Sequence, residues 1–233
     1  MKLLKSLAIS LMALSMSWAA AGQDEDQPDS PVLDIVTVDP ATGFAEIRWL
    51  PSVSPDVGSY VVYTYSGETA MAIDTVKSPF VTTFTHTASA ARYRSVTYVV
   101  AAVDSSLNIS PLSKPLSTVW LSAVNDECTV KITVSWTPYL NQQHPAFSQT
   151  LHIRLATGTF VRDEALSAAA TQFEFTGYDP DTEYCFHVTV SDSGGPLSSS
   201  NRACITTGSE VAPAWVSLDA ISVHSGGLTV SGS

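Results

Sequence analysis

The chain has 233 residues and a formal net charge of −11 at pH 7, from 22 acidic and 11 basic side chains. Proteins that bind nucleic acids need clustered lysines and arginines to neutralise phosphates, so this balance excludes nucleic-acid binding as an expected function. Three cysteines permit one disulfide and leave one thiol over.

Residues 1–21 have the three parts of a secretory signal peptide. Lys2 and Lys5 give a positive start, residues 7–16 are apolar, and three alanines at 19–21 form a small-residue cleavage site. The apolar part is too short to span a membrane as a helix, and no other segment is long enough. We therefore expect a protein that is not membrane-spanning and that is secreted, held at the cell surface or left in the periplasm.

Residues 22–30 are acidic and polar, which predicts a flexible linker. After the linker, short runs of alternating apolar and polar residues end at glycine or proline, a pattern typical of antiparallel strands. Ile47 and Trp49, for example, alternate with Glu46 and Arg48, so that one face of this strand is expected to be buried. The expected strands of this first unit are 32–38, 45–49, 60–65, 70–76, 81–87, 96–103 and 116–119.

The landmarks of the first unit recur after just under 90 residues. The strand that ends at Trp49 is matched by one that ends at Trp136, and the strand from Tyr98 is matched by one from Tyr184. Two landmarks that share one period indicate a tandem repeat. We therefore predict two modules, over residues 31–118 and 119–207, with these four aromatic residues in their cores.

The second unit has expected strands at 130–136, 151–155 and 173–175, and a further strand from Tyr184. Residues 163–170 are rich in alanine, so a helical turn and a connecting bend both stay open. A third copy begins over residues 208–233 with the echoes of two strands. Two strands cannot close a sandwich, so we expect a truncated module that is disordered or swings freely, in a chain that is a fragment of a longer protein.

Many short strands, spaced by about 8–12 residues, predict an all-β fold of two tandem antiparallel β-sandwiches plus an incomplete third unit. The strand that ends in Ile-x-Trp and the later strand led by tyrosine resemble fibronectin type III modules. Residues 179–184 resemble the tyrosine corner of that family, in which the hydroxyl group ties the strand to the preceding turn. This resemblance covers residues 31–207 and implies an immunoglobulin-like sandwich for each module.

The first unit also resembles the repeats of Bacteroidetes cell-surface proteins that are linked to gliding motility and type IX secretion. Those proteins carry a C-terminal sorting domain, for which this sequence shows no counterpart. The resemblance implies a role in an exported surface protein. It rests on residues 38–43, 49–52, 54–57, 70–75, 102–104 and 108–113.

Cys185 and Cys204 are equally distant from the pair Gly194 and Gly195. A hairpin that turns at the two glycines would set the two cysteines opposite each other, at a separation that suits a disulfide. Alternation along the strand places Cys185 on the outer face. Three pairings stay open, and the favoured one leaves Cys128 as the odd thiol.

Residues 192–197 resemble the nucleophile loop of trypsin-like proteases, with Ser193 as the nucleophile. The expected sequence around a catalytic histidine is absent, and two adjacent glycines favour a hairpin turn. We therefore predict no catalytic residue. Asp179, Asp181 and Glu183 lack the register of a calcium loop. The histidines at 86, 144, 152, 187 and 224 have no metal-ligand spacing, so we expect neither a metal nor a cofactor.

The leading hypothesis is a non-enzymatic exported protein whose modules serve as a spacer or adhesive surface at the bacterial cell surface, in gliding motility for example. Its partner would be a surface protein or glycan, and the chain would be monomeric or part of a longer one. The alternative is an accessory carbohydrate-binding module of a secreted polysaccharide-degrading system. That alternative needs an exposed row of aromatic rings, for which the candidates are Tyr63, Tyr65, Trp120 and Trp215.

Overall fold

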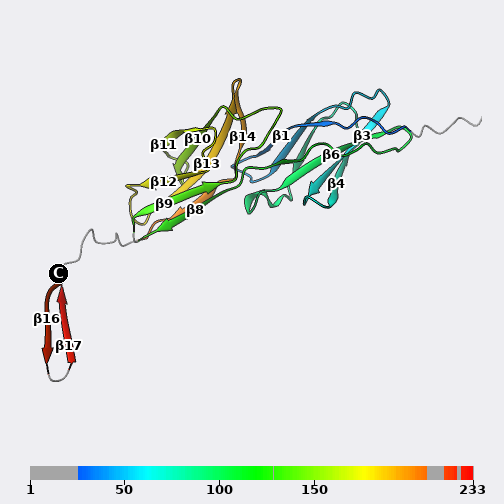
Figure 1. The fold of residues 1–233 in the computed structure, drawn as a ribbon. Coiled ribbons are helices and arrows are strands. Elements are labelled where there is room, and N and C mark those ends of the chain that lie inside the picture. The colour runs from blue at the N-terminus through cyan, green and yellow to red at the C-terminus, as the bar shows by residue number, and fades with distance from the viewer. Residues whose placement is uncertain (1–25, 128, 209–217, 225–226, 233) are drawn as a thin grey trace, which may run out of the picture.

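The computed structural model describes residues 26–127, 129–208, 218–224 and 227–232. The predicted signal peptide and Cys128 lie outside these residues. One 3-10 turn, η1 (Ala90–Arg92), interrupts a fold that is otherwise built from strands and loops (Figure 1). No helix in the described part of the chain is long and apolar enough to cross a membrane.

The first group of strands forms two antiparallel sheets that face each other. The smaller sheet has the order β1-β2-β5, and the larger has the order β4-β3-β6-β7. Apolar residues recur at every second position because one face of each strand packs inward. The strands are β1 (Val32–Val38), β2 (Ala45–Leu50), β3 (Val57–Tyr65), β4 (Ala70–Val76), β5 (Thr83–His86), β6 (Thr97–Asp104) and β7 (Leu116–Ser117).

The second group of strands repeats this order. One sheet runs β12-β9-β8, and the other runs β11-β10-β13, with β14 and β15 both paired to β13. Both groups are therefore antiparallel sandwiches with the strand order of a fibronectin type III-like fold, and the predicted fold class is confirmed. The strands are β8 (Leu121–Asp126), β9 (Lys131–Trp136), β10 (Ser148–Leu155), β11 (Phe160–Ser167), β12 (Gln172–Thr176), β13 (Glu183–Asp192), β14 (Gly195–Ser199) and β15 (Ala203–Thr206).

Three parts of the chain can be compared with the expectations. The alanine-rich stretch from residue 163 continues strand β11, because its residues pair with β10, and only the residues after Ser167 turn. In the expected flexible linker, Pro28 is buried and the amide of Asp29 donates to Ser54 Oγ (2.8 Å). In the third unit, Leu218–His224 (β16) and Gly227–Gly232 (β17) pair as a hairpin, and the alternative that this unit swings freely stays a prediction.

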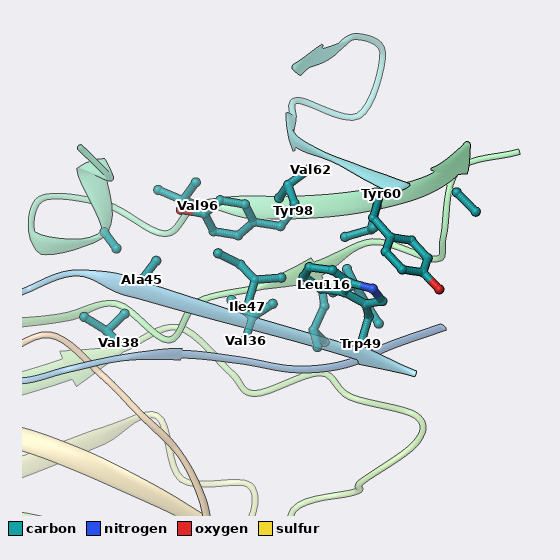
Figure 2. Packing of buried hydrophobic residues seen from close by; sticks show 14 of the residues in the cluster. Val36, Val38, Ala45, Ile47, Trp49, Tyr60, Val62, Val96, Tyr98 and Leu116 are labelled. Carbon is teal, nitrogen blue, oxygen red and sulfur yellow. The ribbon is translucent and has the colours of Figure 1, made fainter. Parts of the chain in front are cut away.

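The core of the first module is centred on Trp49, which is 1% exposed. Its ring meets the ring of Tyr60 edge to face, with 5.4 Å between centroids. Figure 2 shows both rings between the layers, with Ile47 and Leu116 beside them. The Nε1 atom of Trp49 is buried and has no hydrogen-bond partner among the described residues. Tyr98 closes the other end of the core, where its hydroxyl group contacts His86 Nδ1 (3.0 Å).

The second module places a different residue beside its tryptophan. Gln149 lies on β10, opposite Val190 of β13. The Nε1 atom of Trp136 donates to Gln149 Oε1 (2.8 Å). The amide nitrogen of Gln149 donates to the carbonyl oxygens of Ala168 and Ala170. The tryptophan of this module is therefore satisfied by a buried polar network.

A tyrosine corner and a disulfide secure β13. The amide of Asp179 donates to the hydroxyl oxygen of Tyr184 (3.0 Å), as the resemblance implies. Cys185 and Cys204 are directly opposite on β13 and β15 and form a disulfide. Cys185 is only 2% exposed, so the expected outer position is covered in the folded chain. Closing a loop of this length stabilises a fold by about 3 kcal/mol in the chain-entropy model.

The two tryptophans give a matched test of the buried Nε1–H group. Trp136→Phe leaves Gln149 Oε1 buried without its donor, whereas Trp49→Phe removes a donor that has no acceptor. We expect Trp136→Phe to destabilise its module by about 1–3 kcal/mol more than Trp49→Phe destabilises the first. Hydrogen-exchange mass spectrometry in urea would follow the modules separately. Equal losses in the two modules would contradict the prediction.

Candidate interaction site at the junction between the modules

Two edge strands meet where the modules touch. β1 is the outermost strand of its sheet, and β14 is an edge strand of the second module. Ser198 Oγ donates to the carbonyl oxygen of Val36 (2.9 Å), and the amide of Ser199 donates to Thr37 Oγ1 (2.8 Å). An uncovered edge strand invites unwanted pairing, so this contact protects both edges and fixes the modules against each other.

A buried carboxylate lies at one end of this contact. Asp34 is 7% exposed and lies between the apolar residues Leu33 and Ile35 of strand β1. Its Oδ2 atom accepts from Arg48 Nε (2.7 Å) of its own module, and its Oδ1 atom lies 2.6 Å from His144 Nε2 of the second module. Burial by itself raises the pKa of Asp34, but the hydrogen bonds from Arg48 and His144 outweigh it and hold the pKa below the ordinary 3.8.

His144 lies between two carboxylates. Its Nε2 atom contacts Asp34, and its Nδ1 atom lies 3.3 Å from Asp192 Oδ2. A neutral imidazole has one N–H group, so both contacts are hydrogen bonds only when the ring carries two protons. A protonated ring at this place would attract carboxylates of both modules.

The loop before β10 holds His144 in place. Asn141 Oδ1 accepts from the amides of Gln143 and His144, and Asn141 Nδ2 donates to the carbonyl oxygen of Asp34 (2.7 Å) and to Tyr139 Oη (2.8 Å). Burial raises the pKa of Tyr139 to about 12, so its hydroxyl group stays neutral at physiological pH. The amide side chain thereby joins a loop of the second module to the backbone of the first.

A groove of 1160 Å³ opens beside this network and is lined by both modules. Lys114 of the first module reaches across it, with Nζ 3.4 Å from Gln142 Oε1. Most of the wall is apolar, and the side-chain amides of Asn141, Gln142 and Gln143 also line it. The lining includes Leu33, Leu112, Leu116, Leu140, Gln143 and Ala146.

Ser193 lies in the turn between β13 and β14, as the hairpin interpretation expects. Among the hydrogen bonds of the described residues, none joins Ser193 to a histidine. The neighbouring Asp192 contacts His144 instead and accepts from the amide of Gly194 (2.7 Å). Asp192, Ser193 and Gly194 therefore form a turn, and Asp192 also contacts His144 at the junction between the modules.

Two other histidines stack on the outer face of the second module. His152 and His187 are opposite each other on β10 and β13, with ring centroids 4.5 Å apart. His152 contacts Asp163 Oδ1 and Thr189 Oγ1, both at 3.0 Å. Burial, with the charges of His152 and Arg154, lowers the pKa of His187 to about 4. Within the described residues no cluster of three ligating side chains fits a metal ion.

The aromatic residues that were candidates for a carbohydrate-binding row lie in different parts of the structure. Tyr63 and Tyr65 are half-buried on β3, and Trp120 is half-buried between the modules' strands β7 and β8. Trp215 lies outside the described residues. The structure therefore brings together only the two tyrosines of β3.

The junction residues were missed by sequence reasoning. Asp34 gave one signal, since a carboxylate within an apolar strand is rarely buried without a partner. His144 and Asn141 gave none, because their loop lies more than 100 residues from Asp34 in the sequence and its path is set by packing.

No family model and no curated protein matches the chain. The chain is similar to solved structures of fibronectin type III proteins. The FN1-FN3 domains of chicken CNTN1 are 16% identical, over 78% of this chain and 68% of that one (TM-score 0.34). A two-domain fibronectin type III segment of chicken tenascin is 18% identical, over 78% of this chain and 100% of that one (TM-score 0.33). An Fn3-like protein from Clostridium thermocellum is 26% identical, over 40% of this chain and 93% of that one (TM-score 0.34).

These similarities are low in TM-score, so the fold assignment rests on the strand order of each module.

Asp34→Asn should loosen the junction. An amide has one oxygen, whereas the two carboxylate oxygens serve Arg48 and His144 separately. Losing one charged contact costs about 1–3 kcal/mol, so we expect the amide of Ser199 to exchange with solvent about tenfold faster. Hydrogen exchange of this amide is the measurement. Asp74→Asn on exposed β4 is the control, and equal rates in both variants would contradict the role of Asp34.

Acid should destabilise the second module through His187. Its folded pKa of about 4 is below the ordinary 6.5, so the unfolded chain binds the proton more readily. The contribution of neutral His187 to the free energy of unfolding is fully present above pH 6.5. It is lost as the pH falls toward 4, by on the order of 2–3 kcal/mol. Urea unfolding between pH 7 and 4.5 would measure this loss. In His187→Gln the slope should flatten, and an unchanged slope would exclude His187 as its cause.

Proposed function

We propose that this protein is a non-enzymatic exported protein whose tandem modules act as a structural spacer or adhesive surface at the bacterial cell surface. The observation that carries the proposal is the junction. Backbone, hydroxyl and charged groups of both modules bond across it, so the second module is held at a set position relative to the first. A spacer needs such a fixed joint, because a flexible one would not hold a distance.

Three further features support export. The sequence begins with the pattern of a signal peptide, the Cys185–Cys204 disulfide suits an oxidising compartment, and an excess of acidic residues favours solubility. The resemblance of the first module to repeats of Bacteroidetes surface proteins favours a surface context such as gliding motility. Sandwich modules of this class commonly serve as structural or interaction units, and the residues around Ser193 are used for structure.

The proposal can be tested in the producing bacterium. Antibodies against residues 26–208 should label intact cells, and deletion of the gene should reduce adhesion or spreading on a surface. The Ser193→Ala variant should restore both, because no step of catalysis is required. Labelling only after cell lysis would contradict a surface location. Failure of a folded, exported Ser193→Ala variant to restore adhesion would contradict the non-enzymatic role.

A further inference from the structure

A second feature lies at the other end of the contact between β1 and β14, away from Asp34. A cavity of 260 Å³ opens there between the two modules. One arginine from each module lines it: Arg92 from η1 of the first module and Arg202, next to β15, from the second. The rest of the lining is Pro40, Ala41, Gly43 and Cys204.

The first module holds Arg92 against the turn between β1 and β2. Arg92 Nη2 donates to the carbonyl oxygen of Thr42 (2.8 Å). The side chain packs over Gly43, whose φ is +74°, and a Cβ atom there would lie 2.8 Å from Arg92 Nε. A side chain at residue 43 would therefore push Arg92 aside, and glycine makes room for it. In the hydrogen bonds of the described residues one N–H group of this guanidinium is used, and its other donors can serve a ligand.

The second module holds the backbone next to Arg202. Cys204 forms the wall of the cavity two residues later, and its disulfide to Cys185 ties β15 to β13. The two guanidinium groups thus come from two separately anchored backbones. A fixed framework lowers the entropy that ligand binding must overcome.

Among the residues that the structure describes, both arginines lack an acidic partner, although acidic residues outnumber basic ones two to one in the sequence. Within the described part of the chain, neither Arg92 nor Arg202 forms an ion pair; the arginines that do are Arg48, Arg154 and Arg162. Asp39 is near the cavity in sequence, but its carboxylate accepts from the Ala41 amide and the Thr42 hydroxyl and does not line the cavity. Two cations at one cavity repel each other, and an anion between them would remove that repulsion.

We propose that this cavity binds an oxyanion, namely a sulfate, phosphate or carboxylate group, between Arg92 and Arg202. A guanidinium group presents paired N–H donors that match two oxygens of such a group. The volume admits one such group, and a longer molecule that carries it would extend outward along the junction. The group comes either from a free inorganic anion or from an acidic polysaccharide. Because each module supplies one arginine, the bound anion would also link the modules, independently of the spacer role.

Arginine variants of the chain test the site. The probes are inorganic sulfate and a sulfated galactan oligosaccharide, titrated at low salt and followed by the amide NMR signals of Gly43 and Cys204, which line the cavity and are unchanged in every variant. Arg92→Gln and Arg202→Gln should each weaken binding about tenfold. Arg94→Gln is the matched control, because Arg94 is exposed, as Arg92 and Arg202 are, lies two residues from Arg92 and does not line the cavity. It removes the same charge and should leave the affinity within twofold.

The outcomes separate the sources of the anion. Binding of sulfate that depends on both cavity arginines supports a site for free anions, and dependence seen only with the oligosaccharide supports the polysaccharide. Absence of binding to both probes would overturn the proposal. An equal loss in Arg94→Gln would also overturn it, since only overall charge would then matter. Arg92→Lys keeps the charge without the paired donors and should recover only part of the affinity. Such partial recovery would show that the loss in Arg92→Gln does not come from a change in the fold.

Discussion

The Asp34 carboxylate is the point at which the two modules become one body. A carboxylate that loses its hydration needs compensation, and here each oxygen has its own cationic or proton-donating partner. One partner belongs to the same module and the other belongs to the next. The buried charge therefore favours one arrangement of the modules, because any other arrangement would leave it without His144 and without the Asn141 contact to its backbone.

The remaining junction contacts follow the path that β1 takes past the second module. The serines of β14 bond to the middle of the strand, and the turn after Val38 brings Gly43 and Arg92 to the other end. The junction thus has a closed polar cluster at one end and a cavity with two cations at the other. One end favours a fixed geometry, and the other offers a place for a ligand.

The two modules also show how one fold accommodates different polar groups. Both bury a tryptophan at the end of the second strand, at Trp49 and Trp136. In the first module an aromatic ring covers this tryptophan, and its Nε1 atom has no partner among the described residues. In the second module Gln149 accepts that hydrogen bond and donates to the following turn. The group beside the tryptophan therefore comes from β3 in the first module, where Tyr60 lies, and from β10 in the second, where Gln149 lies.

Much of the fold could be predicted because its signals are local. Alternation marks the strands, and the recurrence of Trp49 at Trp136 marks the repeat. The symmetric spacing of Cys185 and Cys204 about two glycines indicates the pairing that the structure contains. Local signals were weaker where pairing decides, as at the end of β11, where the alanine-rich stretch 163–170 leaves a helical turn open while pairing with β10 keeps residues 163–167 extended.

The sequence by itself determined two sandwiches and the apolar faces of their strands, because a period of two residues and a period of one module both recur along the chain, and it favoured one cysteine pairing out of three. Only the tertiary structure decided how the two sandwiches pack against each other. Asp34 meets His144, and Arg92 comes to share a cavity with Arg202, across more than 100 residues of chain. Such contacts depend on the angle at which two finished modules pack, and no local pattern encodes that angle.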